Sequence, residues 1–250
     1  MSAYGEFARY YDALTGNVDY KARGEYLLSL FDKYGKRPKS LLDLACGTGK
    51  LMEIFAEKGI DLIGVDASSD MLSVATERLR PEYPSALLLC QPMALLDLYG
   101  TVEGGVSTLD SLNHLVSLKE IAAVFSRLKF FIQPGGLFVF DMNTPFKHKN
   151  ILGNNSFVLE TKEVFCVWQN EFYEKESRVD ISLDLFTPLP GGNWRRSSEE
   201  FSERAYENRE IISAAEQNGF EFIALCDDMR FDPPQADSER VVFVIKRKEI

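Results

Sequence analysis

The sequence predicts an α/β fold: an open sheet of mostly parallel strands with helices on both faces, and a small antiparallel sheet inserted toward the carboxyl end. Short apolar runs, each about as long as a buried strand, alternate with segments whose apolar residues recur every three or four positions. Several of these runs end in a carboxylate, at Asp43, Asp66, Asp110 and Asp141. This rhythm is lost between residues 146 and 206, where apolar and polar residues alternate instead.

Each element of the core follows from its local pattern. Two amphipathic helices are expected first, over residues 4–19 and 20–34, and Ser68 is a candidate N-cap for a later one. The expected strands are residues 41–44, 60–66, 86–90, 103–110, 137–141, 220–226 and 240–246. The remaining helices are expected to begin near Leu51 and to cover 67–80, 117–132 and 208–218. The last two strands are separated by an acidic loop with two prolines, which suits an antiparallel pair, so the sheet has seven strands with an antiparallel final strand.

The segment from 146 to 206 predicts the inserted sheet. Residues 157–172 and 179–185 are strand-like, and Pro190 to Asn193 is a strong turn signal. We therefore expect residues 1–145 and 207–250 to form the core with an amino-terminal helical cap, and residues 146–206 to form a lid over the carboxyl edge of the core strands.

Composition excludes some function classes. The net charge is −10, which disfavours a nucleic-acid backbone as partner, because phosphate binding normally needs a basic face. No apolar stretch approaches the roughly twenty residues of a membrane span, and the first twenty residues lack a signal-peptide pattern, so we expect a cytoplasmic protein. The four cysteines lack metal-like spacing and lie in or beside apolar runs, so we expect buried thiols without a disulfide or zinc.

The clearest functional signal is the stretch LLDLACGTGK over residues 41–50. Gly47 and Gly49 allow backbone angles and a close approach to a ligand that side chains would prevent. A loop that leads into a helix also directs free amides and a partial positive charge at whatever binds there. Asp66 follows nineteen residues after Gly47, at the tip of the second strand, where a carboxylate can accept the hydrogen bonds of a ribose diol.

Two cofactor classes use this geometry, namely dinucleotides and S-adenosylmethionine. A dinucleotide fingerprint needs G-x-G-x-x-G, but Met52 stands where the third glycine after Gly47 and Gly49 is required. The glycine spacing therefore disfavours an NAD-dependent oxidoreductase.

The same stretch resembles the D-x-G-x-G-x-G motif of class I S-adenosylmethionine-dependent methyltransferases, with Ala45 replacing the first glycine. The phrase L-K-x-x-x-x-P-G-G-L-F-V-F-D at residues 128–141 resembles the helix, turn and fifth strand of that Rossmann-like fold. The cap pattern Y-x-x-F-A-x-x-Y-D-x-L is similar to that of small-molecule methyltransferases, including sugar-amine N-methyltransferases. The carboxyl-terminal run from Glu203 to Tyr206, through the N-G-F turn at residues 218–220 to Ser238-Glu239-Arg240, resembles a bacterial subgroup, the YqeM-like proteins.

The resemblance implies S-adenosylmethionine as cofactor and a set of residues that contact it. Tyr11 and Arg23 would serve the methionyl end, and Met71 would pack on the adenine. The family usually has an acidic residue after the third strand to bind the adenine amino group; Pro92 follows that strand here, which leaves Gln91 or the backbone near Met93. The implied cofactor-binding residues are Tyr11, Arg23, Asp43, Ala45, Gly47, Gly49, Asp66, Ala67, Met71, Gln91, Met93 and Leu109.

Polar residues after the fourth strand predict the acceptor site, because ligands of open α/β sheets bind at the carboxyl edge of the strands. His114 is the candidate general base, and it could equally be a loop histidine that shapes the pocket. The predicted substrate-binding residues are Asp110, Ser111, Asn113, Asn143, Trp168 and Tyr206, with Phe172 and Trp194 as further lid candidates. The alternative for the aromatic residues is that they fill the core of the insert.

These features predict a methyltransferase that moves a methyl group to a nitrogen or oxygen of a small-molecule acceptor by in-line displacement. No metal is expected, since no cluster of histidines or carboxylates is evident in the sequence. The sequence leaves the oligomeric state open. A non-catalytic protein with this fold is the alternative, on the evidence of Ala45 and Pro92.

Overall fold

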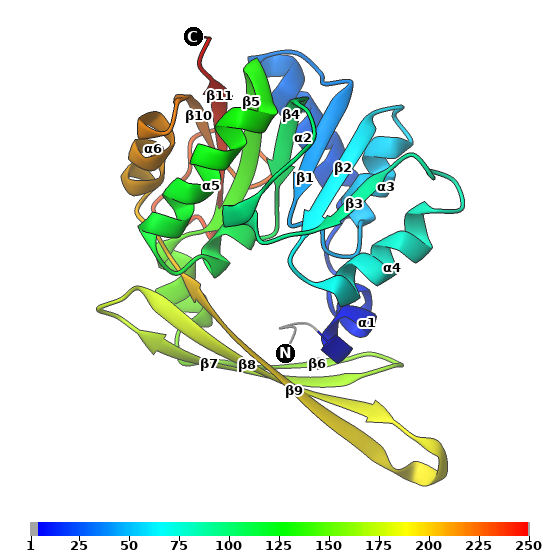
Figure 1. The fold of residues 1–250 in the computed structure, drawn as a ribbon. Helices are drawn as coiled ribbons and strands as arrows, with labels where there is room; N and C mark the ends of the chain where they lie inside the picture. Colours follow the sequence, from blue (N-terminus) through cyan, green and yellow to red (C-terminus); the bar gives the residue numbers. More distant parts are fainter. Residues whose placement is uncertain (1–4, 250) are drawn as a thin grey trace.

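The computed structural model describes residues 5–249 and contains one large and one small β-sheet (Figure 1). The large sheet has seven strands in the order β10-β11-β5-β4-β1-β2-β3. Only β11 runs against its neighbours β5 and β10. The strands are β1 (Ser40–Leu44), β2 (Asp61–Asp66), β3 (Leu87–Cys90), β4 (Val102–Ser107), β5 (Ile132–Asn143), β10 (Phe220–Asp227) and β11 (Arg240–Arg247). The predicted mostly parallel sheet with an antiparallel final strand is confirmed.

Helices cover both faces of this sheet (Figure 1). Leu41 and Leu42 are both fully buried but belong to different hydrophobic clusters, because successive side chains of a strand point to opposite faces. The α-helices are α1 (Gly5–Leu14), α2 (Tyr20–Tyr34), α3 (Lys50–Ala56), α4 (Ser69–Leu79), α5 (Leu118–Phe131) and α6 (Asn208–Gln217). The short helical segments are η1 (Met93–Leu95), η2 (Ser111–His114), η3 (Lys147–Leu152) and η4 (Pro190–Gly192).

The helix starts follow the predicted caps. Ser68 caps α4 by accepting a hydrogen bond from the Met71 amide at 3.2 Å. The first helix was expected from Tyr4, which lies outside the described residues. No helix within residues 5–249 is both long and apolar enough to cross a membrane.

The small sheet is inserted between β5 and α6 and is antiparallel throughout. Its strands are β6 (Ser156–Glu160), β7 (Phe165–Tyr173), β8 (Arg178–Pro188) and β9 (Trp194–Arg204). The predicted strand over residues 157–172 is in fact two strands, because a turn around Thr161 to Val164 separates β6 from β7. Strand β9 was not anticipated.

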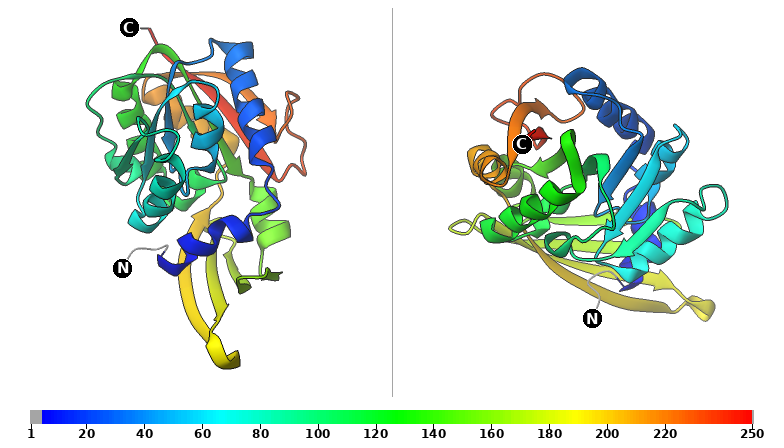
Figure 2. Two further views of the ribbon diagram at one scale, coloured as in Figure 1. Left: turned by 90° about the vertical axis from the view of Figure 1, so that its right-hand side faces the viewer. Right: turned by 45° about the horizontal axis from the view of Figure 1, so that its top comes forward.

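The small sheet lies across the end of the core at which the parallel strands finish, with α1 packed on it (Figures 1 and 2). Phe7 and Ala8 of α1, Met71 of α4 and inner-face residues of β8 such as Ile181 form one buried cluster. The cap, the insert and the core are therefore joined by a shared apolar contact.

All four cysteines are free. Cys46, Cys166 and Cys226 are buried as expected, but Cys90 is exposed, so the expectation of a buried thiol was wrong there. Cys90 is the last residue of β3, which is the edge strand of the large sheet, so one side of the strand end faces solvent.

Candidate cofactor and acceptor site

The turn after β1 places several backbone groups in the left-handed region. Ala45, Gly47 and Gly49 have φ values of 66°, 53° and 76°. The amides of Ala45 and Cys46 both donate to the Val65 carbonyl, at 2.7 and 3.1 Å, which fixes the turn against β2. An alanine in this conformation is strained, because its Cβ crowds the backbone.

The two glycines of the turn serve different purposes. A Cβ added to Gly47 would meet no atom within 4 Å, so this position leaves space toward the cleft. A Cβ added to Gly49 would lie 3.1 Å from the Ala75 Cβ, so Gly49 allows α3 to pack closely on α4.

Asp66 holds the turn from the end of β2. Its carboxylate accepts hydrogen bonds from the Gly47 amide at 2.9 Å and from the Ser68 amide at 2.8 Å. Burial raises the pKa of Asp66, and the backbone amides of Ser68 and Gly47 oppose that rise. Each carboxylate oxygen has a second lone pair with which it can accept a ligand hydroxyl.

A pocket lies between this turn, the cap and the loop after β4. Its wall consists of Tyr11, Tyr20, Asp43, Ala45, Cys46, Gly47, Thr48, Lys50, Leu51, Thr108, Leu109 and Ser111. Asp43 is 2% exposed, and its Oδ2 atom has no hydrogen-bond partner among the described residues. Burial, together with the nearby Asp66, raises the pKa of Asp43 to about 7. A buried carboxylate without a partner is costly, so it favours a cationic or hydrogen-bonding ligand in the pocket.

A buried ionic network supports the next loop. Arg23 pairs with Asp141 at 3.3 Å and with Asp228 at 3.0 Å, and Arg240 bridges Asp141 and Asp110. The Asp141 carboxylate also accepts the amides of Leu109 and Asp110, at 2.9 and 2.8 Å. These bonds hold Leu109 and Asp110 at φ values of 56° and 57°, a backbone conformation that non-glycine residues seldom adopt.

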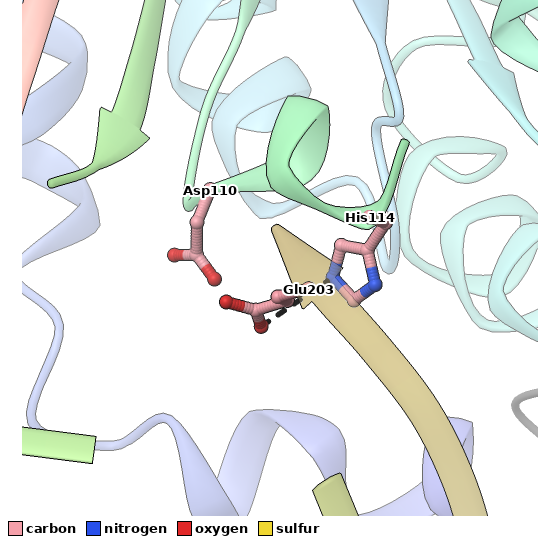
Figure 3. Close-up of side chains that lie close together, drawn as sticks. All are labelled: Asp110, His114 and Glu203. Atoms are coloured by element: carbon pink, nitrogen blue, oxygen red, sulfur yellow. Dashed lines mark ion pairs between the residues drawn. The ribbon is translucent and has the colours of Figure 1, made fainter. Parts of the chain in front are cut away.

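Three side chains converge beyond this loop (Figure 3). Asp110, His114 of η2 and Glu203 of β9 each offer a ligand atom, and these atoms lie within 4.8 Å of one another. The Nε2 atom of His114 is 4.0 Å from Glu203 Oε1. Burial would raise the pKa of Asp110, but Arg240, Lys147 and His114 outweigh it and lower that pKa to about 2. Asp110 is therefore ionised, and the core and the insert together build this polar group.

Comparison with known proteins gives one consistent result. A sequence profile described as a methyltransferase domain matches residues 41–136. The YqeM protein of Bacillus subtilis is 26% identical over 246 residues, which is 98% of both chains. A crystal structure of an S-adenosylmethionine-dependent methyltransferase from Clostridium acetobutylicum is 28% identical, covers 98% of both chains and has a TM-score of 0.88. A Streptomyces venezuelae dTDP-3-amino-3,4,6-trideoxy-alpha-D-glucopyranose N,N-dimethyltransferase is 32% identical over 48% of this chain and 49% of its own.

The chain therefore contains a methyltransferase domain and has the fold of S-adenosylmethionine-dependent methyltransferases.

The pocket of this methyltransferase fits its cofactor. Gly47 leaves open the space that a side chain would fill, Asp66 next to the wall can accept the two ribose hydroxyls, and the Asp43 Oδ2 atom, which has no partner among the described residues, suits a cationic donor. When bound, S-adenosylmethionine supplies a methyl group on a positively charged sulfur.

The structure brings only part of the predicted cofactor set to the pocket wall. Tyr11, Asp43, Ala45, Gly47 and Leu109 line it, and so does Ser111 from the predicted acceptor set. The predicted cofactor residues outside the wall are Arg23, Gly49, Asp66, Ala67, Met71, Gln91 and Met93. Arg23 forms ion pairs with Asp141 and Asp228, and its role at the cofactor stays a prediction.

The residues predicted at the adenine end have other contacts in this structure. Met71 is buried beside α1 in the cluster shared with the insert. The side chain of Gln91 closes the loop before β4. Its Nε2 donates to the Asp97 carbonyl at 3.1 Å, and its Oε1 accepts from the Asp97 backbone amide at 2.9 Å. Ala67 is exposed, and Met93 packs against the core at the start of η1. Their roles in adenine binding stay predictions.

Several predicted acceptor residues have structural contacts. Asn113 is fully buried and donates to the main-chain carbonyls of Asn143 and Arg204, at 3.2 and 2.8 Å, so it ties β9 to the core. Trp168 packs on Phe157, with ring centroids 5.6 Å apart.

Other lid candidates also take part in packing or lie outside the pocket. Tyr206 is 4% exposed and donates its hydroxyl to the Leu115 carbonyl. Phe172 packs within the insert, and Trp194 is exposed at the tip of the β8–β9 hairpin. The packing contacts of Trp168 and Phe172 agree with the alternative that these aromatic residues fill the core of the insert, whereas Tyr206 packs in the core of the large sheet.

The structure also reveals residues that sequence reasoning missed. Asp12 of the cap accepts the Thr48 hydroxyl at 2.7 Å and pairs with Arg78 and with Lys50, so the cap is fastened to the glycine turn. Glu203 stands in a family-like run but was not predicted as a site residue, because one glutamate among several in β9 has no distinctive spacing.

Proposed function

We propose that this methyltransferase transfers the methyl group of S-adenosylmethionine to a nitrogen or oxygen atom of a small-molecule acceptor. The observation that carries the proposal is the polar group of Asp110, His114 and Glu203, which continues from the pocket wall at Leu109 and Ser111. The acceptor would bind there, between the core and the insert. A relative named as an amino-sugar N,N-dimethyltransferase supports a small-molecule acceptor.

The residues of the chain have three tasks in this reaction. The pocket orients the donor, the insert excludes water, and the polar group positions the acceptor lone pair in line with the bond that breaks. Positioning of this kind can supply up to about 7–11 kcal/mol in well-oriented systems. His114 would take a proton from an acceptor that arrives protonated. This division makes residues 1–145 and 207–250 the cofactor-binding core and residues 146–206 the acceptor lid, in a protein that we expect in the cytoplasm.

The test combines binding with product analysis. Isothermal titration with S-adenosylhomocysteine should show saturable binding, and titration with NADH should not. The protein is then incubated with S-adenosylmethionine labelled in its methyl group and with a panel of amines, amino sugars and matched alcohols. Transfer of label to one of these compounds supports the proposal.

Two results would count against it. Binding of S-adenosylhomocysteine without transfer to any compound of the panel favours a protein that keeps the fold without catalysis. Label transfer to a protein or nucleic acid in preference to every small molecule refutes the proposed acceptor class.

A further inference from the structure

Glu203 reaches the site because of its place in strand β9. Its partner across β8 is Val179, and Phe201 lies opposite Ile181, so these residues share the inner face of the small sheet. Glu200 lies opposite Ser182 on the other face and is exposed. Glu203 itself is only 4% exposed, so its carboxylate is held away from water between the insert and the core.

A second histidine lies directly behind this carboxylate. His148 is 0% exposed and belongs to η3, the π-helical turn that leads from β5 toward the insert. Its Nε2 atom is 3.3 Å from Glu203 Oε2, which is close enough for an ion pair although the ring is out of line for a hydrogen bond. Neither ring nitrogen has another hydrogen-bond partner among the described residues. A buried imidazole without other partners points to a specific task, and irregular helical turns of this kind often occur at functional sites.

The surroundings of Glu203 leave one side of its carboxylate available. The side-chain amide of Asn143 donates to Glu203 Oε2 at 3.3 Å, and this is the same oxygen that faces His148. The other oxygen, Oε1, faces His114 and Asp110, and Figure 3 shows the carboxyl groups of Asp110 and Glu203 pointing toward each other. Glu203 is buried, and Asp110 is half-buried and pairs with Arg240 on one oxygen. Two carboxylates so close together repel each other, and a positive group between them relieves that repulsion. A protonated amine has the required charge and the hydrogen-bond donors.

We propose that Glu203 is the carboxylate that receives the amino group of the acceptor, and that His148 is the positioning residue that holds Glu203 in place. This inference rests on the proposed function and specifies its acceptor as an amine. The acceptor enters as an ammonium ion between Glu203 and Asp110 and gives one proton to His114 Nε2. The nitrogen lone pair then forms a bond to the methyl carbon while the carbon–sulfur bond breaks and its electron pair returns to sulfur. The products are a methylated ammonium ion and S-adenosylhomocysteine.

The histidine–glutamate pair is tested by side-chain nitrogen NMR on the whole protein bound to S-adenosylhomocysteine. The chain has only two histidines, so His114→Gln assigns both rings. In the wild-type protein, His148 should keep a proton on Nε2, which faces the Glu203 carboxylate, and this proton should exchange slowly with solvent. Glu203→Gln should shift the His148 signals, whereas the exposed Glu200→Gln on the same strand should leave them unchanged. A His148 ring that exchanges freely in the wild type, or that is the same in Glu203→Gln, overturns the pairing.

The amine site is tested kinetically with the labelled panel. Glu203→Gln should raise the KM for an amine acceptor about tenfold or more, because a neutral amide replaces the carboxylate anion. The Kd for S-adenosylhomocysteine should stay within about twofold of wild type. Glu200→Gln should change neither value. His148→Phe fills the same space without nitrogen atoms and should raise the amine KM, and the double variant should be no worse than Glu203→Gln alone. Additive effects would show that His148 acts independently of Glu203 and would refute its positioning role.

Three further outcomes separate the inference from the proposed function. Methylation of alcohols but not of amines refutes the amine site and leaves the methyltransferase proposal intact. Loss of amine methylation in EDTA that Mg²⁺, Mn²⁺ or Zn²⁺ restores refutes it too, because a metal ion would then occupy the space between Asp110 and Glu203. Failure to bind S-adenosylhomocysteine refutes the proposed function itself, whereas the NMR measurement on the unliganded protein still decides the histidine–glutamate pair.

Discussion

Replacing Asp66 with asparagine tests how one carboxylate serves both the loop and the cofactor. In the structure each Asp66 oxygen accepts one backbone amide, from Gly47 at 2.9 Å and from Ser68 at 2.8 Å. Asparagine has only one oxygen, so in either orientation one of these amides would face an NH₂ group and lose its acceptor. We therefore expect Asp66→Asn to lower the free energy of unfolding by about 1–3 kcal/mol, the usual cost of an unsatisfied buried donor.

The same substitution, Asp66→Asn, should also weaken the binding of the cofactor. Hydrogen bonds to a charged acceptor contribute about 1.5–3 kcal/mol, which corresponds to a rise in the Kd for S-adenosylhomocysteine of roughly ten- to 150-fold. Isothermal titration gives the Kd, and urea denaturation of the same samples gives the stability. Asp61→Asn is the matched control, because Asp61 begins the same strand and is exposed.

The reasoning fails if the Kd of Asp66→Asn stays within about threefold of wild type while Asp61→Asn behaves normally, since that would remove Asp66 from the cofactor site. A loss of stability without a loss of affinity would leave Asp66 only its structural role in the turn.

Three further predictions concern the same site. The folded-state pKa of Asp43, about 7, lies above its ordinary value of 3.8, so the contribution of this group to stability is full below pH 3.8 and is lost as pH rises through 7. Urea denaturation between pH 4 and 8 should show that Asp43→Asn removes this part of the pH dependence. Identical pH profiles for the two proteins would contradict the raised pKa of Asp43. Ala45→Val should lower the free energy of unfolding by about 1 kcal/mol or more, because a β-branched residue is strained at a φ of 66°; an unchanged urea midpoint would show that the turn adapts. His114→Ala should reduce kcat for an amine acceptor about 10²–10⁴-fold and leave the Kd for S-adenosylhomocysteine unchanged, and a kcat loss below about tenfold would remove the general-base role.

The ionic network at Arg23 could not be predicted from the sequence. The family resemblance implies that Arg23 binds the carboxylate of the cofactor. In this structure its guanidinium contacts Asp141 and Asp228, which are 118 and 205 residues away in the chain. No local pattern can indicate such partners, because they depend on how β5 and the loop after β10 approach α2.

The large sheet, the order of its helices and strands along the chain, and the turn from Asp43 to Gly49 could all be predicted from the amino-acid sequence. These features depend on contacts within a few residues, namely the apolar periodicity, the N-caps and the glycines, and such signals survive in a linear reading. The sequence also indicated that an antiparallel sheet is inserted after β5, because alternation and turn signals are local too.

The side chains that meet above the pocket are brought together by the fold and could not be predicted from the sequence. Glu203 joins His148 and His114 because β9 folds back over the core, and Asn113 fixes this arrangement through the Arg204 carbonyl, 91 residues away. The same packing buried Tyr206, and the position of Cys90 on the edge strand β3 left that thiol exposed, against expectation. Charge and burial at each of these positions depend on neighbours that are distant in the chain, and their pairing is therefore settled by the fold.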